Sequence, residues 1–136
     1  MSEAEKIFCS LEVPDSGRRL ASRLEVADTF WKRFTGLQLR PGLEAGEAMI
    51  LVPCASVHTC LMRFPLDLVM LDKNGAVTRV CPGVRPWRAA KAPKGTYAVL
   101  ELAEGASSAV KPGQRLALKM PPGQPVPPSL RFLTAP

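Results

Sequence analysis

The sequence contains two acidic residues inside apolar segments, where a carboxylate needs a partner or a function. Asp67 lies within the segment FPLDLVML and Glu101 within VLEL. Removing a lone carboxylate from water costs on the order of several kcal/mol, so each must find a positive or hydrogen-bonding neighbour if its strand is buried. The available neighbours are His58, Thr59, Arg63 and Arg40. This combination predicts a polar pocket that holds two carboxylates, an imidazole and a guanidinium.

A second interpretation gives the two acids a purely structural role. On a half-buried strand, either carboxylate would face solvent or would accept backbone N–H bonds at a strand end. Residue type and spacing leave both interpretations of Asp67 and Glu101 open.

Two acids and one histidine could also support general acid–base catalysis. Ser56, Thr59 and Cys60 lie near the histidine, but the sequence has no Gly-x-Ser-x-Gly nucleophile elbow. It also lacks Gly-x-x-x-x-Gly-Lys, Gly-x-Gly-x-x-Gly and His-Glu-x-x-His. P-loop hydrolysis, dinucleotide redox chemistry and zincin chemistry are therefore disfavoured, and whether the chain is an enzyme stays open.

Cysteine and histidine could form a metal site, although their spacing is unlike that of structural zinc sites. Cys54, His58 and Cys60 have the same parity and would share one face of a strand, and Cys81 could be a fourth ligand. Structural zinc ligands normally come as close pairs, and the sequence has no Cys-x-x-Cys. Free cysteine is also commonly buried as a small apolar residue. We therefore expect no metal and no cofactor. The alternative is a zinc site formed by these four residues.

Basic residues are concentrated in the second half of the chain. The chain has 18 Lys and Arg against 12 Asp and Glu, a net charge of +6, yet residues 79–136 contain nine basic and only two acidic side chains. No acid lies between Asp72 and Glu101. The candidate anion- or partner-binding residues there are Arg79, Arg85, Trp87, Arg88, Lys91 and Lys94. Such a field attracts polyanions or an acidic partner, and the indole could stack on a base or a sugar. The alternative is a solvated basic loop.

Most of the chain has the residue pattern of short strands. Alternation predicts strands over 7–13 and 20–27, joined as a hairpin. Further strands are predicted over 49–52, 57–62, 66–71, 76–81, 97–102 and 115–120. Asn74-Gly75 between two apolar runs indicates a second hairpin. Helical spacing predicts one short helix over 28–39, capped by Asp28 or Thr29.

These elements predict an α+β fold that is mainly antiparallel β, a small curled sheet or barrel of about seven or eight strands with one short helix. The 136 residues favour one compact domain over residues 1–120. Residues 82–94 are predicted to be a long basic loop, and the proline-rich residues 121–136 a flexible tail. The sequence has no apolar run of membrane-spanning length and no secretory pattern at its start, so we expect a cytoplasmic protein without a membrane partner.

Five segments occur in a distinctive order: FTGLQLR, AMIL, HTCLMRFPLD, VLELAEG and VKPG. In this order they resemble the bacterial and archaeal family called domain of unknown function 192, over about residues 20–120. The resemblance implies a compact, mainly β domain and no established activity. The positions that match the family motif are Thr59, Met62, Pro65, Asp67 and Glu101. Many members have Asn where this chain has His58, so a catalytic role for His58 would not be general to the family.

The sequence favours a small prokaryotic domain that binds a small ligand or a partner through a polar pocket near Thr59, Asp67 and Glu101. The candidate ligand-binding residues are His58, Thr59, Met62, Arg63, Asp67 and Glu101. One alternative is a hydrolase- or transferase-type enzyme with Asp67 or Glu101 as general base. Another is a nucleic-acid-associated protein that uses the basic region 79–119. The identity of the ligand and the oligomeric state stay open.

Overall fold

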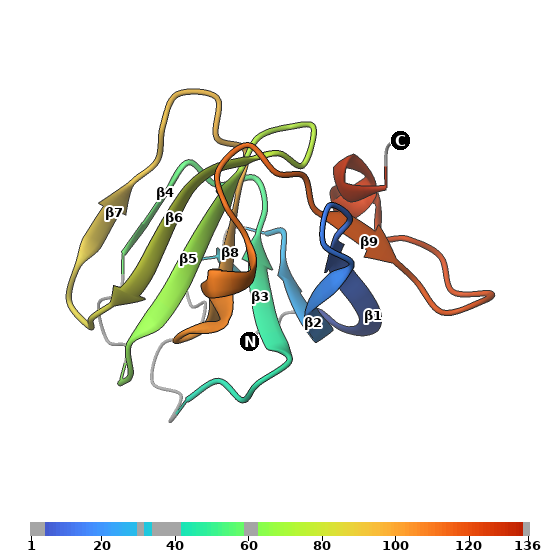
Figure 1. The fold of residues 1–136 in the computed structure, drawn as a ribbon, viewed down its shortest axis with the longest axis horizontal. Helices are drawn as coiled ribbons and strands as arrows, with labels where there is room; N and C mark the ends of the chain where they lie inside the picture. Colours follow the sequence, from blue (N-terminus) through green and yellow to red (C-terminus); the bar gives the residue numbers. More distant parts are fainter. Residues whose placement is uncertain (1–4, 30–31, 34–41, 59–62, 135–136) are drawn as a thin grey trace.

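The computed structural model of the chain describes residues 5–29, 32–33, 42–58 and 63–134 (Figure 1). Within them, the chain forms short strands and two 3-10 helices. In chain order these are β1 (Glu5–Val13), β2 (Arg18–Ala27), β3 (Glu47–Leu51), β4 (Ser56–His58), β5 (Leu66–Leu71), β6 (Val77–Val84), β7 (Ala89–Lys91), β8 (Ala98–Ala103), η1 (Ala106–Ala109), β9 (Ala117–Lys119) and η2 (Pro128–Leu133).

Seven strands form one sheet, in the order β6-β5-β8-β3-β2-β1-β9, and β4 pairs with β7 in a separate two-stranded sheet. Every pairing is antiparallel except that of β2 with β3, which is parallel. The prediction of a mainly antiparallel β fold is confirmed. The barrel alternative is wrong, because the end strands β6 and β9 of the described sheet do not pair along their lengths, although the residues just before them form an isolated bridge, Ala76 with Arg115.

Both predicted hairpins form, and the turn between β5 and β6 has local causes. Between β5 and β6, the Asp72 carboxylate accepts the backbone N–H groups of Asn74 (2.8 Å) and Ala76 (3.0 Å). Gly75 takes a φ of +79°, a left-handed conformation that glycine adopts without a Cβ penalty. The side-chain bonds and the glycine together fix the reversal between the two apolar runs.

The structure differs from the sequence prediction in the basic segment 82–94. β6 continues to Val84, and β7 occupies Ala89–Lys91, so much of the predicted loop is extended and paired. Of the predicted helix 28–39, only Lys32 and Arg33 are described as helical, with the Lys32 N–H directed at Thr29 Oγ1 (3.3 Å). Residues 30–31 and 34–39 lie outside the described residues, as do positions 59–62 of the predicted extended segment 57–62.

The large sheet has an apolar layer on each face, which explains why all six residues of β5 are buried. Val69 and Leu71 belong to the larger cluster, whereas Leu68 and Met70 belong to the smaller one. β7 and the residue after it cover the smaller cluster through Ala90 and Ala92. In Figure 1, β4 and β7 accordingly lie at the left, beside β6.

The C-terminal residues pack on the core, where the sequence predicted a flexible tail over 121–136. Leu130 and Leu133 in η2 are 0% and 1% exposed and join the larger cluster. The Phe132 ring meets the Tyr97 ring edge-on at 5.1 Å, and Ser129 donates to Asp28 (3.0 Å). The prediction missed this element because a 3-10 helix repeats every three residues, and one Leu pair after a proline run is a weak pattern.

Within the part of the chain that the structure describes, no helix is long and apolar enough to cross a membrane.

Candidate functional site

Asp67 is the most completely hydrogen-bonded of the sequence-predicted acids. Its Oδ1 accepts the Gly83 backbone N–H (2.8 Å), and its Oδ2 accepts those of Gly105 (3.0 Å) and Ser107 (2.9 Å). The side chain is 0% exposed. Asp67 therefore connects three segments, namely β6, the turn after β8, and η1.

Local sequence explains why those N–H groups point at Asp67. The β5–β6 pairing shifts its register between Leu66 and Leu68, with Leu66 opposite Val84 and Leu68 opposite Cys81. The two β6 residues left between these partners include Gly83, whose φ is +62°. Gly105 has a φ of +93° and turns the chain from β8 into η1. The Asp67 carboxylate thus accepts backbone N–H bonds. This is the structural role that the second interpretation in the sequence analysis gave to it.

Glu101 is also buried, at 3% exposure, but on the opposite face of the sheet. In the β5–β8 register Asp67 lies opposite Leu102, whereas Glu101 lies opposite Leu68. Cross-strand partners share a face, so Asp67 lies with the larger apolar cluster and Glu101 with the smaller one. The structure therefore does not bring the two acids into one pocket.

A third buried acid, Glu25 on β2, was missed by the sequence analysis. Its side chain is 8% exposed. Met49 on β3 pairs with Glu25 on one side and with Glu101 on the other, which places both acids on the same face with Met49 between them. In the alternation of β2, Glu25 falls in one set with the exposed Arg23, so alternation alone gives no sign that it is buried. The signal for burial was the adjacent apolar pair Val26-Ala27, which indicates a strand with both faces covered.

The remaining predicted pocket residues are only partly visible. His58 is the last residue of β4 and pairs with Ala89, although its side chain is outside the description. Thr59 and Met62, like Arg40, lie outside the described residues, and Arg63 is exposed.

Of the cysteines that the structure describes, Cys9 and Cys81 are free thiols. Cys81 is buried in the smaller apolar cluster, where it packs as a small apolar residue. Among the described residues, no three His, Cys, Asp or Glu side chains come together as a metal site. Cys60 lies outside them.

Cys9 borders a groove of about 280 Å³ between β1 and β9, whose walls include Phe8 and Met120. Partial burial raises the pKa of the Cys9 thiol to about 11, and nearby Arg19 opposes this only in part.

Only the thiolate is alkylated, so the raised pKa of Cys9 should slow its alkylation at pH 8 roughly a hundredfold. We expect iodoacetamide to modify Cys9 that much more slowly in the folded chain than in the urea-unfolded chain, measured by peptide mass spectrometry. Equal rates would contradict the burial of this thiol.

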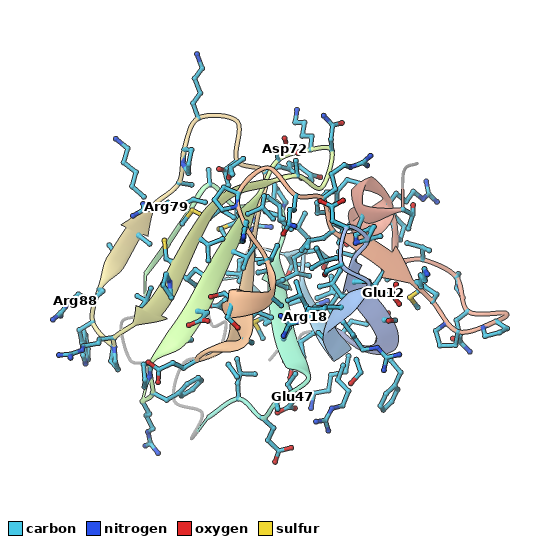
Figure 2. The ribbon with its side chains drawn as sticks, in the orientation of Figure 1. Glu12, Arg18, Glu47, Asp72, Arg79 and Arg88 are labelled. Atoms are coloured by element: carbon cyan, nitrogen blue, oxygen red, sulfur yellow. The ribbon has the colours of Figure 1, made fainter. Side chains whose placement is uncertain are left out.

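The basic residues of the sequence analysis are gathered on one end of the molecule, around β6, β7 and the turn that joins them. Figure 2 shows Arg79 and Arg88 at the left, on this side. The side chains there are exposed: Arg79, Arg85, Trp87, Arg88, Lys91 and Lys94. We call residues 79–94 the basic hairpin, for the bend of the chain from β6 into β7; these two strands belong to different sheets and do not pair with each other.

Two contacts fix the shape of the basic hairpin. The Arg79 guanidinium donates to the backbone carbonyl of Lys91 (2.7 Å) and so ties β6 to β7. β7 is held on the other side by β4, with Ala90 opposite Val57. Arg79 thus links the two strands within the hairpin; we call this link the Arg79 brace. The residues between the strands, 85–88, form the tip of the hairpin, and most of them are exposed.

Trp87 at this tip has an unusual conformation. Its φ is +62°, the only positive value among the described non-glycine residues, and 61% of the residue is exposed. A bulky residue rarely adopts a left-handed backbone, and such strain is often found at functional positions. Trp87 belongs to neither apolar cluster. Core packing of the indole therefore does not offset the cost of its left-handed backbone.

Comparison with known proteins identifies similar chains. The model of a family named DUF192 and described as "Uncharacterized ACR" matches residues 11–118. A "UPF0127 protein" of Thermococcus sibiricus is 36% identical over 76 residues, which make up 53% of this chain and 49% of that protein. The match thus spans about half the length of this relative.

Two crystal structures have a similar fold. One, from Sinorhizobium meliloti 1021 and provisionally described as a transcription regulator, has a TM-score of 0.76 and 21% identity, covering 87% of this chain and 97% of that one. The other, a protein of unknown function from Novosphingobium aromaticivorans, has a TM-score of 0.67 and 23% identity, covering 79% of this chain and 81% of that one. At these identities the likeness shows the fold alone.

Proposed function

The chain belongs to the DUF192 family, whose function is unknown, and we propose that it acts as a binding domain for an anionic partner, which it contacts through the basic hairpin. The observation that carries the proposal is the outward Trp87 in a strained backbone, surrounded in sequence by exposed basic residues and by no acid between Asp72 and Glu101. Trp and Arg are both enriched at protein interfaces relative to the rest of the surface.

The placement of the acids supports this choice over a ligand pocket built on Asp67 and Glu101. Both oxygens of Asp67 accept backbone N–H bonds, and Glu101 lies on the other face of the sheet. A general base at Asp67 would have to give up contacts that hold three segments together. The proposal therefore uses no catalytic residue.

Binding should depend on the position of the basic groups and not only on the total charge. We expect the double variant Arg88→Ala, Lys91→Ala to elute from immobilised heparin, a generic polyanion, at a clearly lower salt concentration than the native chain. Fewer ion contacts mean a smaller release of counterions on binding.

The matched control is the double variant Lys6→Ala, Arg18→Ala, which loses the same charge from exposed positions on β1 and β2. Figure 2 shows Arg18 well away from Arg88. This control double variant should elute at a salt concentration close to that of the native chain. Equal shifts for the two double variants would mean that only net charge matters, and would contradict the proposed site.

A further inference from the structure

We infer that the anionic partner of the basic hairpin is a single-stranded nucleic acid, with one base stacked on the Trp87 indole and the adjoining phosphates held by neighbouring Arg and Lys side chains. This inference rests on the proposed function and names its partner class. Proteins that bind single strands combine exposed aromatic rings for the bases with basic side chains for the backbone.

The Trp87 ring supplies the part of the site that a purely charged surface lacks. It is 61% exposed at the tip of the hairpin, and its backbone carbonyl accepts a bond from the Arg88 guanidinium (3.4 Å). The Arg88 guanidinium thereby stays close to the backbone of Trp87. Every base has a flat π-face that can stack on an indole, whereas the Asp and Glu side chains of an acidic peptide have none.

The charges follow the chain on both sides of the ring. Arg85 precedes the indole, and Lys91 and Lys94 follow it, all exposed. The phosphates on the two sides of a base stacked on Trp87 would therefore find basic side chains nearby in the chain. Of the acids labelled in Figure 2, Glu12 and Glu47 lie away from this end, and Asp72 lies in the turn before β6. The exposed Glu104 borders the hairpin at Gly83, on the other side of the bend from Lys91 and Lys94 in sequence.

The architecture favours a single strand over a duplex. Reading the major groove of a duplex requires an α-helix or a two-stranded ribbon that can enter it. The ribbon in this region, β4 with β7, has one face packed on the smaller apolar cluster through Ala90. Trp87, in the bend between β6 and β7, is 61% exposed and so can receive an unpaired base.

The test is fluorescence anisotropy of the full chain with fluorescein-labelled oligothymidylate of about 12 nucleotides, within the usual site size of such domains. We expect Trp87→Ala to weaken binding at least about tenfold, because the stacked base loses its platform. Trp87→Phe should retain most of the affinity. Trp87→Asn should weaken binding as Ala does without lowering the melting temperature, since Asn tolerates a left-handed backbone. The matched control is Phe8→Ala, because Phe8 on β1 is also exposed, at 72%.

The outcomes separate the inference from the proposed function. If heparin and polyglutamate bind as tightly as the oligonucleotide, and Trp87→Ala leaves all three affinities unchanged, the partner class is wrong while anion binding stands. If none of the three binds, even at low salt, the proposed function itself fails. Weakening by Trp87→Ala for the oligonucleotide alone, with Phe8→Ala unchanged, supports the inference. A duplex of the same sequence that binds more tightly than the single strand would overturn it.

Discussion

Replacing Asp67 with Asn is expected to lower the free energy of unfolding by about 3 kcal/mol, measured by urea denaturation. The carboxylate is 0% exposed and accepts three backbone N–H bonds. An Asn amide offers one oxygen in place of two, and its NH₂ group would face at least one buried N–H donor. That donor would lose its partner in a place that water does not reach.

Asp72→Asn is the matched control, because Asp72 also accepts two backbone N–H bonds, but in a partly exposed turn. Water can replace a lost acceptor there, so a cost of about 1 kcal/mol or less is expected. If both variants lose the same stability, Asp67 does not hold β6, the turn after β8 and η1 together. A loss confined to Asp67→Asn identifies this acid as a structural element of the family fold.

Replacing both Leu130 and Leu133 with Ala is expected to lower the free energy of unfolding by about 5 kcal/mol, since each buried Leu→Ala change costs about 2–5 kcal/mol. Both side chains are almost fully buried in the larger apolar cluster. Thermal unfolding followed by circular dichroism measures the effect. Arg131→Ala on the same helix is the control and should be neutral, because Arg131 is exposed.

A double variant that melts with the native chain would contradict the packing of η2. It would instead favour the flexible tail that composition predicts for residues 121–136. The experiment thus decides whether residues 128–133 pack on the core or belong to a flexible tail.

The strands were largely predictable from the sequence because their signals are local. The alternation in β1 and β2 and the Asn74-Gly75 turn each depend on neighbours within a few residues. The family resemblance is likewise confirmed by the match over residues 11–118. The open sheet was not predictable in this way, because closure depends on whether β6 and β9 pair along their lengths beyond the isolated Ala76–Arg115 bridge, which no local pattern encodes.

The candidate site was harder to predict because it depends on register. Sequence analysis placed Asp67 and Glu101 in strands but left open whether their side chains are buried, and in the structure both are buried. Their placement on opposite faces follows from which residue of β8 faces which residue of β5. One residue of slip would have put both on the same face. The buried Glu25 was hidden by an alternating pattern that is normally a sign of exposure.

The exposed Trp87 shows a different limit. The sequence placed an indole among basic residues, but it could not show that the backbone there is left-handed or that the ring projects outward. Those properties depend on β7 pairing with β4 and on the Arg79 brace, both of which are long-range contacts.

The pairing of β1 with β9 has a consequence for how the chain is made. Residues 10–12 pair with residues 117–119, and the N-terminal Leu11 and Val13 share a core with Leu130 and Leu133. Contacts between such distant residues slow folding, because a long loop must close first. During synthesis, the outer edge of β1 over residues 10–12 is unpaired until the ribosome has released β9. This part of β1 therefore lacks one partner for most of translation, and unpaired strand edges of this kind are prone to misfolding and early association.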